Sequence, residues 1–433
     1  VDPHYMKLET QGTTSLVLMM DSNDILPVKN YQYGHHPEAV KMYGEVYEKR
    51  YFRQDVPDGC YFGCTLACTK GCEFFELRTG PFAGRKVGVD GPEYETAASA
   101  ACCGIFDPEY TMEFNWYCDE YGLDTIGTGI TMAFLCECFE RGYLTTEDTE
   151  GLALNWGAVE DLTVLLHQMA AGEGFGRFAG RGTRKLKGWI AERHSKRTGR
   201  KAAQIQRELD WFAMECKGLE FSVYVTKESL AQQGGYGFAL KGAQHDEAWL
   251  IAVDQIKNEM PSFEEKARAL RWFPLFRTWF NIVGLCKLPW IDVRHPEAKD
   301  TSEPAKNLPS VEYYLEMVNA TLGTSKSLDD LIFESERIYT FQKLINLRQG
   351  VGTREHDQIP LRAMAPVFEN EYEAKADHYD AELAREGVAV KELSLAMRLE
   401  KIQKLRRSRY ESLCDAVYRE KGYDSCAIPT AAT

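Results

Sequence analysis

A run of evenly spaced cysteines near the start of the chain constrains this protein more than any other sequence feature. The segment DGCYFGCTLACTKGC places Cys60, Cys64, Cys68 and Cys72 four residues apart. On one continuous helix, Cys60 and Cys68 would stand roughly 12 Å apart and Cys72 roughly 18 Å from Cys60, so one cluster could not collect all four. If three thiolates hold a single iron–sulfur cluster, the segment must wrap as a loop, and the three glycines within it give the backbone that freedom.

Zinc binding and core packing are the other interpretations of these cysteines. Zinc sites usually pair C-x2-4-C with a second, distant pair of Cys or His, and the sequence has no such C-x-x-C pair. Free cysteines are commonly buried as small hydrophobes, although four at equal spacing fit that interpretation less well. The chain has 13 cysteines, six of them between Cys60 and Cys103, which favours a metal or redox site in a reducing compartment over a secreted disulfide framework.

The composition excludes several classes of protein. The chain has 433 residues, 44% of them hydrophobic, which is enough for two globular cores. Its formal charge of -14 argues against a main role in binding the phosphate backbone of DNA or RNA. No apolar stretch approaches the roughly 18 residues of a membrane span, so we predict a soluble, cytoplasmic protein. Because the chain starts at Val1 without an initiator methionine, we expect a further segment upstream.

The spacing of apolar residues predicts a mainly α-helical protein. Strands are expected only at 14–20, where SLVLMM reads as an alternating patch, and at 85–91, RKVGVDG. Helices are predicted over the ranges 37–51, 93–103, 109–120, 130–142, 155–171, 264–280, 310–322, 327–347 and, as a charged pair, within 369–423.

A basic stretch at 184–201 divides the pattern. It holds eight Lys or Arg and one Glu in an otherwise acidic chain. We take it as a boundary near residue 200, which gives one helical domain at 1–200 and a second at 201–433. The stretch is a candidate to meet the phosphates of a coenzyme A substrate, and a solvated surface helix or linker explains it as well.

Two distant segments share one pattern. DEYGLDT spans Asp119 to Thr125 and NIVGLCK spans Asn281 to Lys287, and each reads acid or amide, two variable residues, Gly-Leu, then Asp or Cys. A glycine lets the backbone approach an anion closely, and short polar side chains beside it can bind ring nitrogens or phosphates of a bulky cofactor. Either copy alone would be weak evidence for a cofactor site, so the inference rests on the presence of both.

This pair, with the cysteine run upstream of the first copy and Cys286 inside the second, resembles the tungsten-containing aldehyde ferredoxin oxidoreductase family over essentially the whole chain. In that family the two segments grip two tungstopterin molecules, and a 4Fe–4S cluster is held by three near cysteines and the cysteine of the second segment. The resemblance implies a mainly α fold of two helical domains, the family's domains 2 and 3, without its N-terminal β-rich domain.

The resemblance also implies a set of ligands. Cys60, Cys64, Cys68 and Cys286 would hold the cluster, with Cys72 left over. The implied pterin-binding residues are Asp119, Gly122, Leu123, Asp124, Thr125, Asn281, Gly284, Leu285 and Lys287. Two departures stand out: the run is C-x3-C-x3-C where the family has C-x2-C-x3-C, and Asn281 replaces an Asp, so it can donate a hydrogen bond but carries no charge.

Finer similarity points to one branch of the family. The chain resembles the active-site subunit of class II, ATP-independent benzoyl-CoA reductases in the segments GPEYETAASAACCGIFDPEY, LLHQMAAGEGFG, KESLAQQGGYGFALKGAQHDEAW, FRTWFNIVGLCKLPW and GTREHDQIPLRAM. That branch reduces the aromatic ring of benzoyl-CoA to a cyclic conjugated dienoyl-CoA and uses a cysteine as a tungsten ligand. The context CGIFDP makes Cys103 the expected ligand, with Cys102 as the alternative. A soft, all-sulfur environment suits tungsten for low-potential chemistry.

Protons for such a reduction must come from a positioned acid. His245 in GAQHDEAW is the leading candidate, and Glu93 and Glu95 in GPEYET are carboxylates that orient it or relay protons. The structural alternatives are a histidine hydrogen-bonded within the core, and acids that complement a helix N-terminus after Pro92. His35 and His36 are assigned to a surface loop.

The segment NLRQGVGTREHDQIPLR resembles a family segment near the cofactor, and a salt-bridged structural loop explains it equally well. Its charged residues are Arg348, Arg354, Asp357 and Arg362.

Three hypotheses follow. The first is a tungsten-bispterin, 4Fe–4S oxidoreductase that acts on an aromatic acyl-CoA as the catalytic subunit of a larger complex. The second, of the same family, oxidises aldehydes to acids with ferredoxin as acceptor. The third is an electron-transfer or structural subunit without tungsten. Molybdenum remains the alternative metal, magnesium is a further candidate cofactor, and an oligomer with ferredoxin or an iron–sulfur partner subunit is expected.

Overall fold

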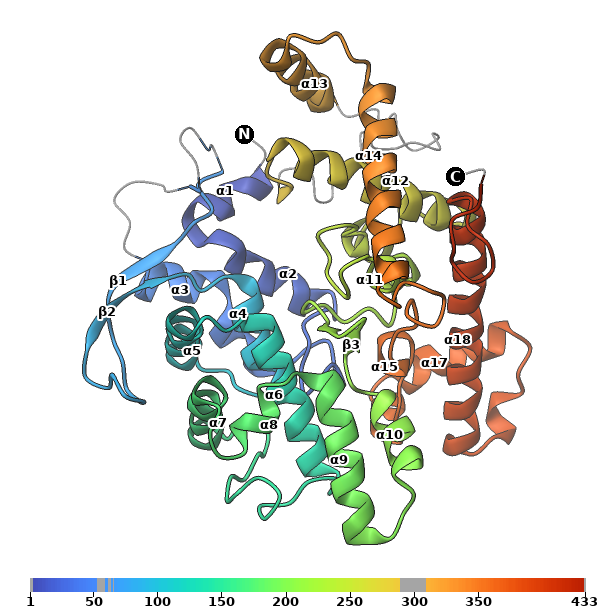
Figure 1. Ribbon diagram of the computed structural model, residues 1–433. Helices are drawn as coiled ribbons and strands as arrows, with labels where there is room; N and C mark the ends of the chain where they lie inside the picture. The colour runs from blue at the N-terminus through green and yellow to red at the C-terminus, as the bar shows by residue number, and fades with distance from the viewer. Residues whose placement is uncertain (1–2, 53–58, 61–63, 65, 289–308, 432–433) are drawn as a thin grey trace. The chain divides into compact units, whose positions relative to one another are not determined.

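The computed structural model describes residues 3–52, 59–60, 64, 66–288 and 309–431. The chain forms two compact units, Val1–Val225 and Thr226–Thr433, and both are built almost entirely from helices (Figure 1). The expected mainly α fold is therefore confirmed. None of the helices in the described ranges is long and apolar enough to cross a membrane.

The first unit is built around a bundle of helices that are close neighbours in the chain (Figure 1). Helix α4 packs against α5 and α6, and α5 also contacts α7. In chain order, the larger elements of this unit are α1 Pro3–Gln11, α2 Leu16–Ser22, α3 Gly44–Arg50, β1 Gly71–Glu76, β2 Lys86–Asp90, α4 Tyr94–Cys102, α5 Pro108–Tyr121, α6 Thr125–Glu140, α7 Val159–Ala171, α8 Gly176–Ala179, α9 Thr183–Thr198, α10 Ala202–Asp210, β3 Glu215–Cys216 and β4 Leu219–Glu220.

The strand expected at 14–20 is wrong. The chain there forms a 3-10 turn, Gly12–Ser15, and then α2. Val17, Met20 and Asp21 are buried, which is the i, i+3, i+4 spacing of one helix face. The Asp21 carboxylate accepts hydrogen bonds from the Tyr43 hydroxyl at 2.7 Å and from the His36 amide at 3.1 Å, so tertiary contacts select the helix.

The strand expected at 85–91 is confirmed as β2, which pairs antiparallel with β1. Gly71 lies opposite Asp90 and Glu76 opposite Lys86, with a register irregularity between Cys72 and Phe75. This hairpin contains Cys72, the last cysteine of the run. It leads into α4, the helix predicted after Pro92.

Two glycines in the turn between β1 and β2 make a matched test of packing. Gly80 and Gly84 have φ of 70° and 83°, but a Cβ on Gly80 would collide with the His167 imidazole and the Tyr117 hydroxyl, whereas a Cβ on Gly84 would meet nothing within 4 Å. We expect Gly80→Ala to lower the free energy of unfolding by about 3 kcal/mol, from backbone strain plus overpacking. Gly84→Ala carries the strain alone, about 1 kcal/mol. Urea denaturation of both variants checks this, and equal losses would contradict the packing of His167 against Gly80.

The basic stretch at 184–201 is helix α9 with its C-terminal turn, and it packs against α10 within the first unit. Its cations are largely paired with acids: Arg193 and Arg197 contact Asp148, and Lys187 contacts Glu215. Because α9 and α10 pack on each other, the division between the units falls at Val225, later than the boundary near residue 200 that the sequence indicated.

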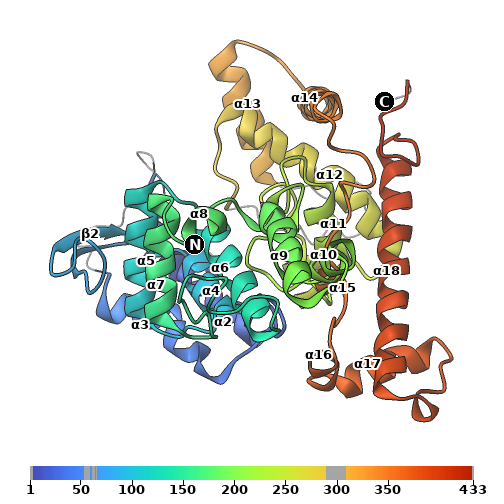
Figure 2. The same ribbon diagram turned by 60° about the horizontal axis from the view of Figure 1, so that its bottom comes forward.

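The second unit is built from helices joined by loops (Figure 2). Helix α12 packs against α11, α14 and α18, and α17 packs against α18. The elements are α11 Leu230–Phe238, a π-helical turn Ala252–Ile256, α12 Phe263–Val283, α13 Pro309–Leu322, α14 Leu328–Arg348, α15 Leu361–Met364, α16 Glu369–Glu373, α17 Ala376–Arg385, a 3-10 turn Val390–Glu392 and α18 Leu395–Glu420. The sequence predicted α12, α13 and α14 to within a few residues of these ends.

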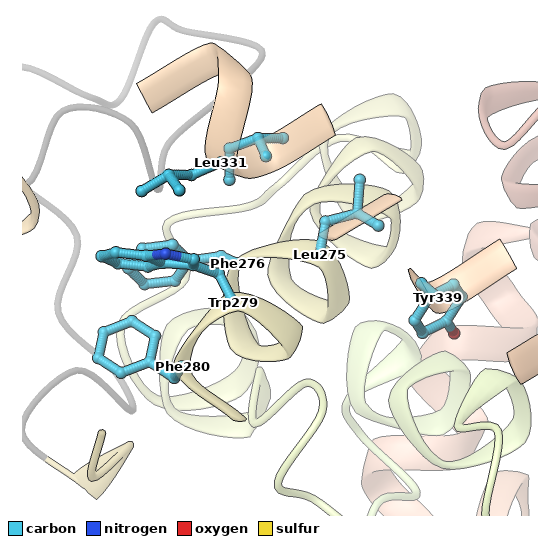
Figure 3. Packing of buried hydrophobic residues seen from close by; sticks show 7 residues of the cluster. Leu275, Phe276, Trp279, Phe280, Leu331 and Tyr339 are labelled. Carbon is cyan, nitrogen blue, oxygen red and sulfur yellow. The ribbon is translucent and has the colours of Figure 1, made fainter. Parts of the chain in front are cut away.

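An aromatic cluster joins α12 to α14 (Figure 3). Trp279 is 1% exposed, and its ring lies 5.3 Å from that of Phe280, centroid to centroid. From α14, Leu331 and Tyr339 close the cluster. Burial of large aromatic side chains is the main stabilising term available to this end of α12, which directly precedes the second Gly-Leu motif.

Candidate functional site

The first Gly-Leu motif is the junction between α5 and α6. Helix α5 ends at Tyr121, and Gly122 adopts a left-handed conformation with φ 65° and ψ 35°. The Leu123 amide donates to the Cys118 carbonyl at 2.8 Å, which is the hydrogen bond of a Schellman helix end. Asp124 then caps α6, since its carboxylate accepts from the Gly127 amide at 2.5 Å. This cap starts α6 at Thr125, five residues earlier than the helix that the sequence predicted from residue 130.

The second motif has the same local structure. Helix α12 ends at Val283, Gly284 is left-handed with φ 71° and ψ 30°, and the Leu285 amide donates to the Phe280 carbonyl at 2.9 Å. A Cβ on Gly122 or Gly284 would meet nothing within 4 Å. Positive φ, rather than crowding, therefore requires glycine in both copies, and the shared leucine occupies the position of the Schellman hydrophobic contact.

Asn115 on α5 connects three segments of the first unit. Its amide nitrogen donates to the Asp90 carbonyl at 2.7 Å and to the Asp119 carboxylate at 3.2 Å, and its amide oxygen accepts from the Thr96 hydroxyl at 2.9 Å. The GPEYET segment and the first motif are thus brought together. Asn115 was missed from the sequence, where its place one helical turn before Asp119 was the available signal.

Glu93 and Glu95 begin α4 in that same region. Burial, followed by the charges of Glu93 and Asp124, raises the pKa of Glu95 to about 8. Its Oε2 atom is buried and has no hydrogen-bond partner among the described residues. Glu93 accepts a hydrogen bond from the Thr13 hydroxyl at 2.7 Å, while burial and Asp90 raise the pKa of Glu93. Near neutral pH, Glu95 is therefore a protonated acid among carboxylates.

The cysteine run is not helical at any of its described residues before β1. Cys60 is exposed, Cys64 and Cys68 are half-buried, and Cys72 is buried in β1. A Cβ on Gly59 would lie 2.7 Å from the Cβ of Cys64, so the backbone of Gly59 packs directly on that side chain. Within the described ranges, no three or more His, Cys, Asp or Glu side chains form a preassembled metal site.

The remaining predicted metal ligands lie elsewhere in the chain. Cys286, in the second unit, is half-buried, and its sulfur accepts from the Leu288 amide at 3.4 Å. Cys102 and Cys103 are buried at the end of α4 in the first unit. The Cys103 thiol donates to the Gly129 carbonyl at 3.4 Å, and a hydrogen bond with Cys136 together with burial raises its pKa well above the usual range.

His245 lies in a polar group of the second unit. The neighbouring Asp246 carboxylate accepts from Lys241 at 2.9 Å and from Lys287 of the second motif at 3.1 Å, and its backbone carbonyl accepts from Arg277 at 3.2 Å. Burial lowers the pKa of His245 to about 4; Asp246 opposes this and the three cations add to it. The imidazole is therefore neutral near pH 7. Asp246 was not predicted from the sequence.

The segment at 346–362 forms ion pairs within the second unit. Arg354 contacts Glu411 at 2.7 Å and Arg362 contacts Glu371 at 2.6 Å, whereas Asp357 accepts from the Tyr418 hydroxyl at 2.9 Å. These contacts match the salt-bridged structural alternative. His35 and His36 occupy the loop before Pro37, where His35 is exposed and hydrogen-bonded to Asp21.

The fold and these motifs define a class of protein with two helical domains, each of which carries one helix–Gly-Leu junction. The whole chain, residues 1–433, matches the family model "Aldehyde ferredoxin oxidoreductase, domains 2 & 3". The chain therefore belongs to the aldehyde ferredoxin oxidoreductase family.

Individual relatives agree with this family. The chain is 28% identical over 362 residues to the tungsten-containing aldehyde ferredoxin oxidoreductase of Pyrococcus furiosus, covering 82% of this chain and 52% of that protein. It is 27% identical to the enzyme of the same name from Thermococcus kodakarensis, with the same coverage. It is also 30% identical over 280 residues to the aliphatic sulfonate oxidoreductase WOR-like subunit of P. furiosus, covering 60% of this chain and 42% of that protein. The chain spans about half the length of the curated relatives that it matches.

Among solved structures, the fold resembles that of the active-site complex BamBC of benzoyl coenzyme A reductase bound to 1,5-dienoyl-CoA. The TM-score is 0.63 at 15% identity, with 98% of this chain and 59% of that chain covered.

Proposed function

We propose that this chain forms the cofactor-binding part of a tungsten-bispterin, 4Fe–4S oxidoreductase that reduces the ring of benzoyl-CoA or a related aromatic acyl-CoA to a cyclic dienoyl-CoA. The aldehyde ferredoxin oxidoreductases that the chain matches are named as tungsten-containing, and a benzoyl-CoA reductase complex has a similar fold. The observation that carries the proposal is Glu95, a buried acid that holds a proton near neutral pH beside the first Gly-Leu motif. Ring reduction consumes protons as well as electrons, so it needs such an acid.

The residues present fit the cofactors. The thiols of Cys60, Cys64 and Cys68 are soft ligands on a non-helical segment, and Cys286 would complete the cluster. The residues Asp119, Gly122, Leu123, Asp124, Thr125, Asn281, Gly284, Leu285 and Lys287 would hold the pterins, with Cys103 on the tungsten and magnesium as a further candidate. When bound, these groups supply low-potential electrons to the substrate.

The protein's own contribution is to store and place the proton. Burial first, and then the charges of Glu93 and Asp124, oppose ionisation of Glu95 and raise its pKa to about 8, so the proton stays on the carboxyl near neutral pH. His245 is neutral at pH 7, because a pKa near 4 leaves it almost no proton to give as imidazolium. We therefore infer that Glu95, rather than His245, is the acid.

One other function has specific support, and one further hypothesis stays open. Oxidation of aldehydes to carboxylic acids with ferredoxin as acceptor is favoured by the names of the Pyrococcus and Thermococcus relatives. An electron-transfer or structural subunit without tungsten is the third hypothesis. The WOR-like subunit and the BamBC complex belong to proteins named as assemblies, which supports a partner subunit here too.

Metal analysis of anaerobically purified protein tests the proposal. We expect about one tungsten and about four irons per chain, which would justify comparing benzoyl-CoA with benzaldehyde as substrates. Four irons without tungsten or molybdenum would favour the electron-transfer hypothesis. No iron would overturn the cluster assignment.

A matched pair of variants locates the iron. Cys64→Ser removes a proposed ligand, so we expect it to lose most of the iron and the associated visible absorbance. Cys426→Ser changes an exposed cysteine of the second unit and should leave the iron content unchanged. Equal iron in the two variants would contradict the role of Cys64.

A further inference from the structure

A cavity of about 400 Å³ lies within the second unit, between α11, the start of α12, α17 and α18. That volume is in the range of small-molecule sites. None of its lining residues belongs to the cysteine run, to the Gly-Leu motifs or to the group around His245. Its wall has an apolar part and a charged part, which come from different elements.

The apolar part comes from four side chains around the start of α12 and from α11 and α15. These are Leu230, Pro261, Phe263 and Met364. Met364 is 2% exposed, and Phe263 is half-buried. A ligand with an apolar body could therefore remove hydrocarbon surface from water here.

The charged part contains cations that are already neutralised. Arg406 is buried and contacts Glu382 at 2.6 Å and Glu228 at 3.0 Å, while His378 also contacts Glu228, at 2.9 Å. Burial alone would raise the pKa of Glu228, but the hydrogen bonds and charges of His378 and Arg406 lower it to about 2, so this carboxylate is ionised. Lys227 is likewise paired, with Glu371 at 2.8 Å. The charges of these lining cations are therefore balanced by neighbouring carboxylates.

Arg385 is different from those cations. It is exposed at the end of α17, on the same face as His378 and Glu382, at positions i, i+4 and i+7. Its Nε donates to the Ala381 carbonyl of its own helix at 3.3 Å, and no carboxylate among the described residues pairs with its guanidinium. Arg409 also lines the cavity, but it is paired with Glu382 and with Glu386.

The cavity therefore offers one arginine, Arg385, that pairs with no described carboxylate, and an apolar wall. An organic anion has both a negative charge for the arginine and a hydrocarbon body for the wall. A guanidinium presents a planar pair of donors that fits a carboxylate. We propose that this cavity binds a small organic acid, whose carboxylate pairs with Arg385 and whose apolar body packs against Phe263 and Met364. The site is independent of the proposed redox function, and its test does not require loaded cofactors.

Isothermal titration of the whole chain with benzoate as the probe tests the proposal. Arg385→Gln should weaken benzoate binding about tenfold or more, because it removes one charge-assisted pair. Arg407→Gln is the matched control, since Arg407 is exposed on α18 and does not line the cavity; it should bind as the wild type does. Phe263→Ala should weaken binding about fivefold through lost apolar contact.

Two further probes separate the two halves of the site. Benzamide has the same body without the charge, and inorganic phosphate has charge without the body. We expect both to bind at least tenfold more weakly than benzoate. The proposal is overturned if benzoate does not bind, if Arg385→Gln and Arg407→Gln bind it equally, or if either probe binds as tightly as benzoate.

Discussion

Replacing Glu95 by glutamine is expected to make the protein more stable at pH 8 than the wild type, although it removes a group from the proposed site. Between the unfolded pKa of 4.5 and the folded pKa of about 8, the folded protein keeps a proton on Glu95 that the unfolded chain has lost. The free energy of unfolding of the wild type therefore falls as the pH rises through this window. The glutamine amide of the variant does not titrate in this range, so the variant should gain about 3 kcal/mol relative to the wild type between pH 5 and pH 8.

Urea denaturation at pH 5 and at pH 8 measures this difference. Glu192→Gln is the matched control: Glu192 is exposed on α9 in the same unit, and its variant should follow the wild-type pH dependence. Under the proposed function, Glu95→Gln in the cofactor-loaded protein should also lower turnover at pH 7 by about a hundredfold or more, because the amide cannot give up a proton. If the stability of Glu95→Gln changes with pH as that of the wild type does, Glu95 ionises at an ordinary pH and does not hold the proton.

The sequence was a good guide where a local signal coincided with the tertiary structure. The helix after Pro92, the strand before it and α12 to α14 follow periodicity and capping, and the structure has them close to the predicted ranges. The segment at 14–20 failed because seven residues rich in apolar side chains suit either period. The hydrogen bonds of Asp21 with Tyr43 and His36 stabilise the helix, and no local pattern in the sequence predicts them.

In the candidate site too, local features were predicted from the sequence and long-range contacts were not. Both Gly-Leu motifs were found from their shared spacing and were interpreted as cofactor-binding segments. The structure adds that each is a helix end closed by a left-handed glycine and an apolar residue. Asn115 and Thr13 were not found, since their roles depend on partners far away in the chain: Thr13 binds Glu93, 80 positions away. The raised pKa of Glu95 was also not predicted. Its largest cause is burial, and the charges of the neighbouring Glu93 and of Asp124, which folding brings close, add to it.

The second motif depends on packing as much as on its glycine, and Trp279 tests that dependence. Trp279→Ala should lower the stability of the second unit by about 3–5 kcal/mol, because it opens a cavity among Phe276, Phe280 and the side chains of α14. The indole nitrogen is buried with no hydrogen-bond partner among the described residues, so Trp279→Phe should cost only the lost volume, about 1.5 kcal/mol. Phe341→Ala, on an exposed position of α14, should change stability by about 0.5 kcal/mol or less.

Hydrogen exchange connects this loss to the motif. The Leu285 amide donates to the Phe280 carbonyl, one residue after Trp279, so loosening the end of α12 should speed exchange at Leu285. We expect this in Trp279→Ala but not in Phe341→Ala, while the corresponding amide of Leu123 in the first unit stays protected in both. If Leu285 keeps its protection when Trp279→Ala has lost several kcal/mol, the junction is held by its local hydrogen bonds alone. The geometry of the two motifs would then follow from the glycine and the leucine, independently of the aromatic cluster beneath the second one.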